Sequence, residues 1–205
     1  NSSDDERTWN EMTPGFYGGS LPTNLAFTYG SGYFTLPVGE TRKFAIACLF
    51  GNDFDDIIRN KKTMQKIYDA DYSFAKPPRL PTLKATAQDG KVVLTWDDIA
   101  ENSIDPIYYK DFEGYLIYRS TDPSFNSIKT ITDTYGNPIY WEPIAQFDLK
   151  NGLFGPHPLA VGETGAHFNM GSDSGLKYYY VDENVNNGRT YYYAICSYDK
   201  GYDID

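Results

Sequence analysis

The residues that could bind a metal or carry out catalysis are few and widely spaced in this chain of 205 residues. Its two histidines, His157 and His167, stand ten residues apart in a glycine-rich stretch that also contains Asp173. Imidazole and carboxylate groups are ordinary metal ligands, but the ligands of a protein zinc site follow a tighter spacing. We therefore interpret the two histidines as surface residues and expect no metal to be bound there.

Acidic residues form three clusters that deserve comparison with calcium sites. Calcium takes several oxygen ligands from a short loop, and extracellular modules often bind it weakly. None of the clusters matches the EF-hand loop pattern, and the first is explained as the start of a helix. The second and third are loop acids near the ends of predicted strands, and the third is our calcium candidate. The clusters are Asp53, Asp55 and Asp56; Asp97, Asp98 and Glu101; and Asp199, Asp203 and Asp205.

The sequence contains no arrangement typical of an enzyme. Glycoside hydrolysis requires two carboxyl groups that face each other across a cleft, and no such pair stands out. The Gly-x-Ser-x-Gly turn of serine hydrolases is missing, and two histidines offer little choice of a catalytic base. The glycines Gly162, Gly165, Gly171 and Gly175 do not link a strand to a helix, so they predict no phosphate-binding loop. We therefore predict a protein that is not an enzyme and has no cofactor, with calcium as the one open alternative.

Aromatic residues are the remaining candidates for binding. They make up 17% of the chain and include 19 tyrosines, too many for all of them to be buried. Exposed rings stack on sugars or anchor protein interfaces. We favour the interpretation that most rings cover the faces of a β fold. The candidates for contact with a ligand or partner are Trp141, Tyr178, Tyr192 and Tyr198.

Charge and hydropathy restrict the possible partners. The formal net charge of -10 disfavours nucleic acid, because an acidic surface repels phosphate backbones. No apolar stretch of these 205 residues is long enough to span a bilayer, and we expect no signal peptide among them. Since the chain begins at Asn1 and not at methionine, we expect a processed or excised piece of a longer polypeptide.

Cys48 and Cys196 are the only cysteines, and they lie far apart in the sequence. A domain held together by disulfides would contain several cysteines in a short chain, so packing must stabilise this protein. We interpret each cysteine as a small apolar strand residue. A disulfide between the two halves stays an open alternative.

A proline-rich linker, predicted at 77–81, divides the chain. Residues 1–76 are predicted to be the C-terminal part of a β domain that ends in a helix at about 53–70. Asn52 or Asp53 can cap this helix, and we expect its apolar stripe to pack on the sheet of its own domain. The strands predicted before the helix are 24–28, 32–36 and 41–50.

Residues 82–205 show the pattern of an all-β domain. Alternating apolar residues predict strands, and Asp89-Gly90 is a typical hairpin turn between the first two. The predicted strands are 83–87, 91–96, 114–120, 141–145, 177–181 and 190–198.

The motifs of this half resemble those of a fibronectin type III module. The resemblance covers about residues 78–205 and implies an immunoglobulin-like β-sandwich. Two departures stand out: a long insertion at 146–175 interrupts the strand spacing, and the final strand of the family is not found before Asp205. We expect that strand either to lie beyond Asp205 or to be supplied by another chain or segment, and an unpaired edge there would be open to association. The matching motifs are Pro81-x-Leu83-x-Ala85, Val92-x-Leu94-x-Trp96, Gly114 to Arg119, Tyr180-x-Asp182-x-x-Val185 and Gly188-x-x-Tyr191-x-Tyr193-x-Ile195.

The resemblance also suggests structural roles. Trp96 and Tyr115 are large enough to bridge two facing sheets, and their polar atoms can reach the rim. Tyr191 would form a tyrosine corner, in which its hydroxyl bonds to the backbone a few residues upstream. Cys196 would then face outward as a free thiol at the surface or edge. The structural residues expected in this way are Trp96, Tyr115, Asp182, Val185, Tyr191 and Tyr193.

These observations predict a mainly β, non-catalytic module of a larger extracellular or cell-surface protein, structural or adhesive in function and able to associate with itself. Its partners would be other domains of the same polypeptide or neighbouring chains. The alternative is a carbohydrate-binding accessory module of a secreted enzyme. A looser resemblance of 32–53 to multidomain surface proteins of the Bacteroidetes type favours a bacterial origin.

Overall fold

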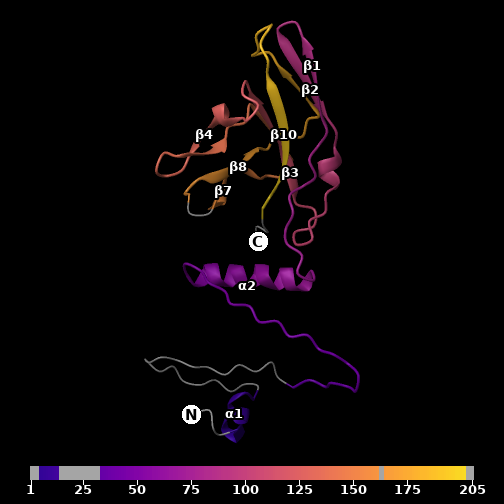
Figure 1. Cartoon of the computed structure of the whole chain (residues 1–205), viewed down its shortest axis with the longest axis vertical. Coiled ribbons are helices and arrows are strands. Elements are labelled where there is room, and N and C mark those ends of the chain that lie inside the picture. Colours follow the sequence, from indigo (N-terminus) through magenta and orange to yellow (C-terminus); the bar gives the residue numbers. More distant parts are fainter. Residues whose placement is uncertain (1–4, 14–32, 162–163, 202–205) are drawn as a thin grey trace. The chain divides into compact units, whose positions relative to one another are not determined.

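A computed structural model describes residues 5–13, 33–161 and 164–201 of the chain (Figure 1). It is mainly β, with antiparallel sheets and two α-helices within these ranges. The chain divides into two compact units, Asn1–Cys48 and Leu49–Asp205. The linker expected at 77–81 therefore lies inside the second unit.

The first unit contains the helix α1 (Asp5–Glu11) and a turn in which Glu40 donates its N–H to the carbonyl of Pro37 at 3.1 Å. The strands predicted at 32–36 and 41–50 are not formed between residues 33 and 50. Alternating apolar residues form a strand only beside a partner, and the described residues provide none here. The strand predicted at 24–28 lies outside the described residues.

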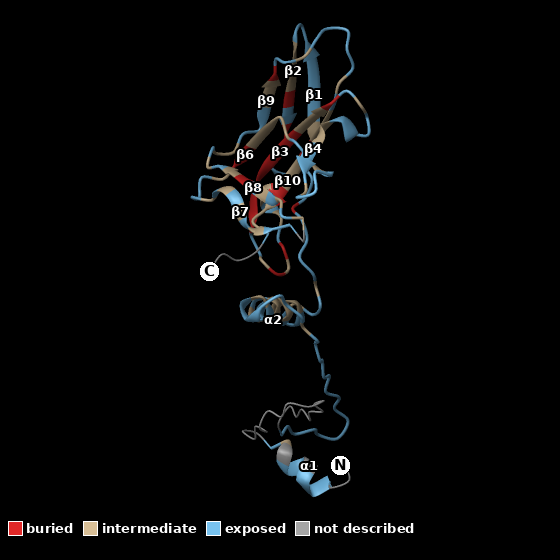
Figure 2. Ribbon diagram, turned by 90° about the vertical axis from the view of Figure 1, so that its left-hand side faces the viewer, coloured by how far each residue is buried: buried red, intermediate tan, exposed pale blue. Residues whose placement is uncertain are grey.

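The helix predicted at about 53–70 is present as α2 (Phe54–Asp69). The carboxylate of Asp53 caps it by accepting the N–H of Asp56 at 2.8 Å, as expected for a residue of this type before a helix. No residue of α2 is buried, so the expected packing of its apolar stripe on a sheet is not found (Figure 2). Phe54, at its start, is 74% exposed.

Two antiparallel three-stranded sheets form the main part of the second unit (Figure 1). Their strand orders are β1-β2-β9 and β10-β3-β6. Five of the predicted strands occur here, one with the predicted bounds and four with ends shifted by one or two residues, whereas β6 was not predicted at this place. The strands are β1 (Leu83–Gln88), β2 (Lys91–Trp96), β9 (Tyr179–Asp182), β10 (Tyr192–Asp199), β3 (Phe112–Ser120) and β6 (Ala145–Asp148).

The apolar core lies between these two sheets, and Figure 2 shows buried positions along β2 and β3. The rings of Trp96 and Tyr115, on opposite sheets, meet at a centroid distance of 5.9 Å and an angle of 63°. Phe147 of β6 stacks on Trp96 at 6.1 Å. The core residues are Leu94, Trp96, Ala100, Phe112, Tyr115, Ile117, Phe147 and Ile195.

The insertion predicted at 146–175 is not a structureless loop. Its first residues complete β6, because Phe147 belongs to the core. The rest forms a hairpin of β7 (Phe154–Ala160) and β8 (His167–Ser172). A second hairpin joins β4 (Lys129–Thr132) to β5 (Pro138–Trp141), so the strand predicted at 141–145 is instead split between β5 and β6.

Short connections complete the unit. Two 3-10 helices, Ile99–Asn102 and Asn126–Ile128, precede β3 and β4. The proline-rich linker is bonded to this unit: Arg79 donates its N–H to the hydroxyl of Ser103 at 2.8 Å, and its carbonyl accepts from the hydroxyl of Ser197 at 2.9 Å.

Candidate functional site

The face of β3 that points away from the core is covered by the two hairpins. Tyr115 and Ile117 lie in the core, so Leu116 and Tyr118 point to the opposite side of the sheet. Leu116 is buried and Tyr118 is half-buried, which shows that this side is packed and not open to solvent. Figure 1 shows β4, β7 and β8 together on one side of β3 and β10.

A pocket of about 150 Å³ lies in this outer layer. Burial raises the pKa of the Tyr118 phenol to about 12, so its hydroxyl stays protonated at neutral pH. Trp141, at the pocket wall, is 43% exposed and carries the ammonium of Lys129 over its ring at 5.3 Å from the centroid. We call this space the outer pocket, and its walls include Tyr118, Tyr140, Trp141, Gln146, His167 and Phe168.

The structure does not bring the four predicted partner aromatics together. Trp141 lines the outer pocket. Tyr178, just before β9, and Tyr192, the first residue of β10, lie elsewhere, and they are 43% and 38% exposed. Tyr198 was expected to be available for contact, and that prediction is wrong. Its hydroxyl donates to the carbonyl of Met170 at 2.9 Å and accepts from the amide of Gln146 at 2.8 Å. The β7–β8 hairpin covers this part of β10, so Tyr198 is only 7% exposed.

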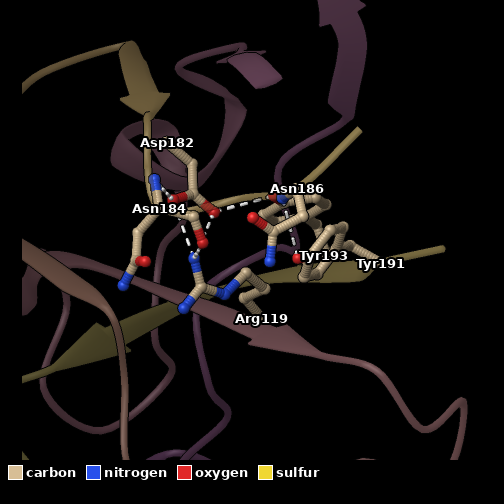
Figure 3. A network of polar contacts seen from close by, with 6 residues as sticks. All are labelled: Arg119, Asp182, Asn184, Asn186, Tyr191 and Tyr193. Atoms are coloured by element: carbon tan, nitrogen blue, oxygen red, sulfur yellow. Dashed lines mark hydrogen bonds and ion pairs between the residues drawn. The ribbon is translucent and has the colours of Figure 1, made fainter. Parts of the chain in front are cut away.

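Asp182 lies at the centre of a polar network between the two sheets (Figure 3). Nη1 of Arg119 donates to both its carboxylate oxygens, at 2.8 and 2.9 Å, and to the carbonyl of Asn184 at 2.7 Å. The hydroxyl of Tyr193 donates to the same carboxylate at 2.7 Å. The motifs identified Asp182 and Tyr193 but not Arg119 as their partner. One feature of the sequence could have indicated this pair. Arg119 falls on the inward-facing side of β3, and a cation in that position requires an anion nearby.

The hydrogen bond expected for Tyr191 is present. Its hydroxyl accepts the backbone N–H of Asn186 at 3.0 Å (Figure 3). Val185, in the same turn, is half-buried. Arg119 and Arg189 both lie against the Tyr191 ring, at 5.8 and 5.7 Å from its centroid. These contacts hold the turn between β9 and β10 against the sheet that contains β3.

Buried acidic residues at one end of β3 were not predicted. Glu113 and Asp148 are both fully buried. Burial raises the pKa of Glu113 to about 7, and the nearby charge of Asp148 adds to this effect. Burial alone would also raise the pKa of Asp148, but hydrogen bonds from Ser174 and the backbone hold it below the usual value. One oxygen of Glu113 has no hydrogen-bond partner in the described part of the chain, consistent with a protonated carboxyl.

Asp111 is a third buried acid, two residues before Glu113. Burial raises its pKa to about 6, with a further contribution from the charges of Asp199 and Asp105. Asp105 itself accepts the N–H groups of Ile107 and Tyr108, at 2.6 and 2.7 Å, and so closes a loop.

Metal binding gains no support within residues 5–13, 33–161 and 164–201, where no group of histidine, cysteine and carboxylate side chains is arranged to hold a metal ion. Of the calcium candidates, Asp199 is half-buried, while Asp203 and Asp205 lie outside the described residues. His157 and His167 are on neighbouring strands, and the Nδ1 of His167 bonds to the carbonyl of His157 at 2.6 Å.

Both cysteines are free thiols. Cys48 is exposed and lies in no strand, contrary to the expectation of an apolar strand residue. Cys196 lies on β10, but it is half-buried and not at the surface, because the outer layer covers its side of the sheet.

Comparison with known protein families, with curated proteins and with solved structures finds no match for this chain. Neither helix in the part of the chain that the structure describes is long and apolar enough to cross a membrane.

Proposed function

We propose that this chain is a non-catalytic structural or adhesive module of a larger extracellular or cell-surface protein, and that it associates through the free edge of β10. The observation that carries the proposal is the pairing of β10, which has β3 as its one strand neighbour among the described residues. The extracellular assignment rests on the resemblance of residues 78–205 to a fibronectin type III module.

The backbone groups at this edge can be assigned from the ladder. Ile144 donates its N–H to the carbonyl of Ile117 at 2.8 Å, so the backbone of Ile117 points toward β6. Ile195 lies opposite Ile117 in the β10–β3 register. In an antiparallel ladder, a pair that exchanges no hydrogen bonds points its backbone groups away from each other. The N–H and C=O of Ile195, and by alternation those of Tyr193, therefore point toward the free edge.

The sequence of β10 leaves this edge open to pairing. Natural edges are blunted by proline, lysine or bulges, and the segment Tyr192–Cys196 contains none of these. At Ser197 the linker lies against the strand, held by the bond from the Ser197 hydroxyl to the carbonyl of Arg79. The free part of the edge thus extends over the first five residues of β10 and offers backbone donors and acceptors to an added strand.

The buried carboxylates support a role without catalysis. Asp105, Asp148 and Asp182 each accept several hydrogen bonds from backbone or side-chain groups and stabilise loops or join sheets. A carboxylate with its lone pairs occupied in this way is poorly placed to move protons to a substrate.

The test combines sedimentation with hydrogen exchange of the intact chain. If a second copy adds a strand, the chain self-associates as its concentration rises, and exchange of the Ile195 amide slows with it. The Cys196 amide is the internal control, because it points toward β3 and is protected in both states. A chain that stays monomeric with unchanged exchange at Ile195 contradicts self-association, and protection of Ile195 in dilute solution would mean that the edge is not open.

A further inference from the structure

We propose that the outer pocket binds one pyranose ring of a neutral glycan. This site is separate from the free edge of β10, and the proposal does not depend on strand addition there. It is argued from the size of the pocket, its aromatic wall, its unused hydrogen-bonding groups and its lack of charge.

The size of the pocket selects a small ligand. Sites for drug-sized molecules usually have volumes of roughly 300–1,000 Å³. The outer pocket, at about 150 Å³, has room for a single ring and not for a chain of rings. A longer glycan would therefore place one unit in the pocket and the others outside it.

The aromatic wall suits the apolar face of a sugar. Trp141 lines the pocket and is 43% exposed, although it lies in a packed layer. The ammonium of Lys129 lies over the indole at 5.3 Å from its centroid, and Lys129 itself is not among the described residues that line the pocket. The C–H groups of a pyranose ring stack on such a face in the same way as other apolar groups.

The lining also has hydrogen-bonding capacity that the fold does not use. The hydroxyls of Tyr118 and Tyr140 have no hydrogen-bond partner among the described residues. Gln146 donates through its amide nitrogen to Asn169 and Tyr198, so its carbonyl oxygen remains able to accept. Nδ1 of His167 donates to the carbonyl of His157, and in the neutral imidazole Nε2 is then an acceptor. Sugar hydroxyls both donate and accept, so they match this mixed set.

The charge of the site favours a neutral ligand. Among the described residues, no aspartate, glutamate, lysine or arginine side chain lines the pocket. A sugar acid or amino sugar would place its charge against a described lining that holds no aspartate, glutamate, lysine or arginine, which is unfavourable. A purely apolar occupant, such as a leucine side chain of a partner protein, would instead leave the two tyrosine hydroxyls unpaired.

Binding is tested on the full chain with methyl glycosides of glucose, mannose, galactose and xylose, by saturation-transfer NMR and tryptophan fluorescence. We expect at least one of them to bind with millimolar affinity. Trp141→Ala should weaken binding at least about tenfold, since loss of a central aromatic contact has effects of this size. Tyr179→Ala, which removes a 60% exposed ring outside the pocket, should leave binding unchanged.

Because Trp141→Ala could disturb the β4–β5 hairpin, Tyr118→Phe provides a second variant. It removes one hydroxyl that the fold does not use, and we expect weaker sugar binding with unchanged thermal stability. The proposal is wrong if no glycoside binds at tens of millimolar, or if binding survives both substitutions. Binding of indole or a leucine-rich peptide in place of every sugar would identify the pocket as an anchor for a partner side chain and would also overturn it.

Discussion

Arg119 on β3 reaches across the sandwich to Asp182 on β9, and its Nη1 lies 2.8 and 2.9 Å from the two carboxylate oxygens. Asp182 is 1% exposed, so its charge depends on this partner. Breaking a buried ion pair from one side leaves an uncompensated charge. We expect Arg119→Met to lower the free energy of unfolding by about 3 kcal/mol in urea denaturation.

Arg189→Met is the matched control for that change. Arg189 also lies against the Tyr191 ring, but it is exposed. Its replacement should change the free energy of unfolding by less than about 0.5 kcal/mol. Equal losses in the two variants would show that the contact with Tyr191, and not the pairing with Asp182, accounts for the stability.

The hydrogen bond between Tyr191 and Asn186 gives a second prediction. Tyr191→Phe keeps the ring and removes the acceptor for the Asn186 N–H. We expect a loss of about 1 kcal/mol in unfolding free energy, the usual contribution of one such bond. Tyr192→Phe, which alters an exposed hydroxyl on the neighbouring residue, should have no measurable effect.

The raised pKa of Glu113 predicts how the stability of the fold depends on pH. Folding raises its pKa from 4.5 to about 7, and that of Asp111 from 3.8 to about 6. Between its ordinary pKa and its raised pKa, each carboxyl is protonated in the folded state and ionised in the unfolded state. The resulting contribution to the free energy of unfolding is lost as the pH rises through 6 to 7. We expect thermal denaturation to show higher stability at pH 5 than at pH 8.

Glu113→Gln isolates the contribution of this residue. A neutral amide cannot titrate, so the fall in stability between pH 5 and pH 8 should become smaller, with the part due to Asp111 remaining. An unchanged pH profile would mean that Glu113 is already ionised in the folded protein at pH 5.

The two thiols should differ in reactivity. Cys48 is exposed, while Cys196 is half-buried and burial raises its pKa. Because the thiolate is the reactive form, a disulfide reagent at pH 8 should modify Cys196 at least about tenfold more slowly than Cys48. Single Cys→Ser variants assign the two rates, and similar rates would show that the outer layer opens readily.

The sequence motifs were sufficient for five of the six strands in the two sheets, because period-2 alternation and large core residues act locally. The exception is β6, most of which falls in the predicted insertion at 146–175. Trp96 and Tyr115 meet in the core, as expected from their size. The hydroxyl of Tyr115 reaches Glu101 at 2.9 Å, but the Nε1 of Trp96 is buried without an acceptor in the described part of the chain, so the expectation that both polar atoms reach the rim holds for one of them.

The outer layer was not predictable in the same way. The alternation in 154–160 is interrupted by Gly155, Pro156 and Pro158, which weaken any strand signal. Whether Tyr198 and Cys196 are covered depends on where the β7–β8 hairpin folds back, a long-range contact that no local pattern specifies. The strands predicted in the first unit are not formed for a different reason. Their local pattern of apolar residues is strong, but no neighbouring strand is described with which they could pair.

The unpaired edge of β10 limits which substitutions this strand can accept during evolution. The backbone groups that it offers belong to Tyr193 and Ile195, residues whose side chains the folded interior needs. A proline that would close the edge at either position would also damage the interior, so mutation cannot easily remove the edge. Ala194 and Cys196, whose side chains face the outer layer, are the positions on this segment where substitution leaves the core between the two sheets unchanged.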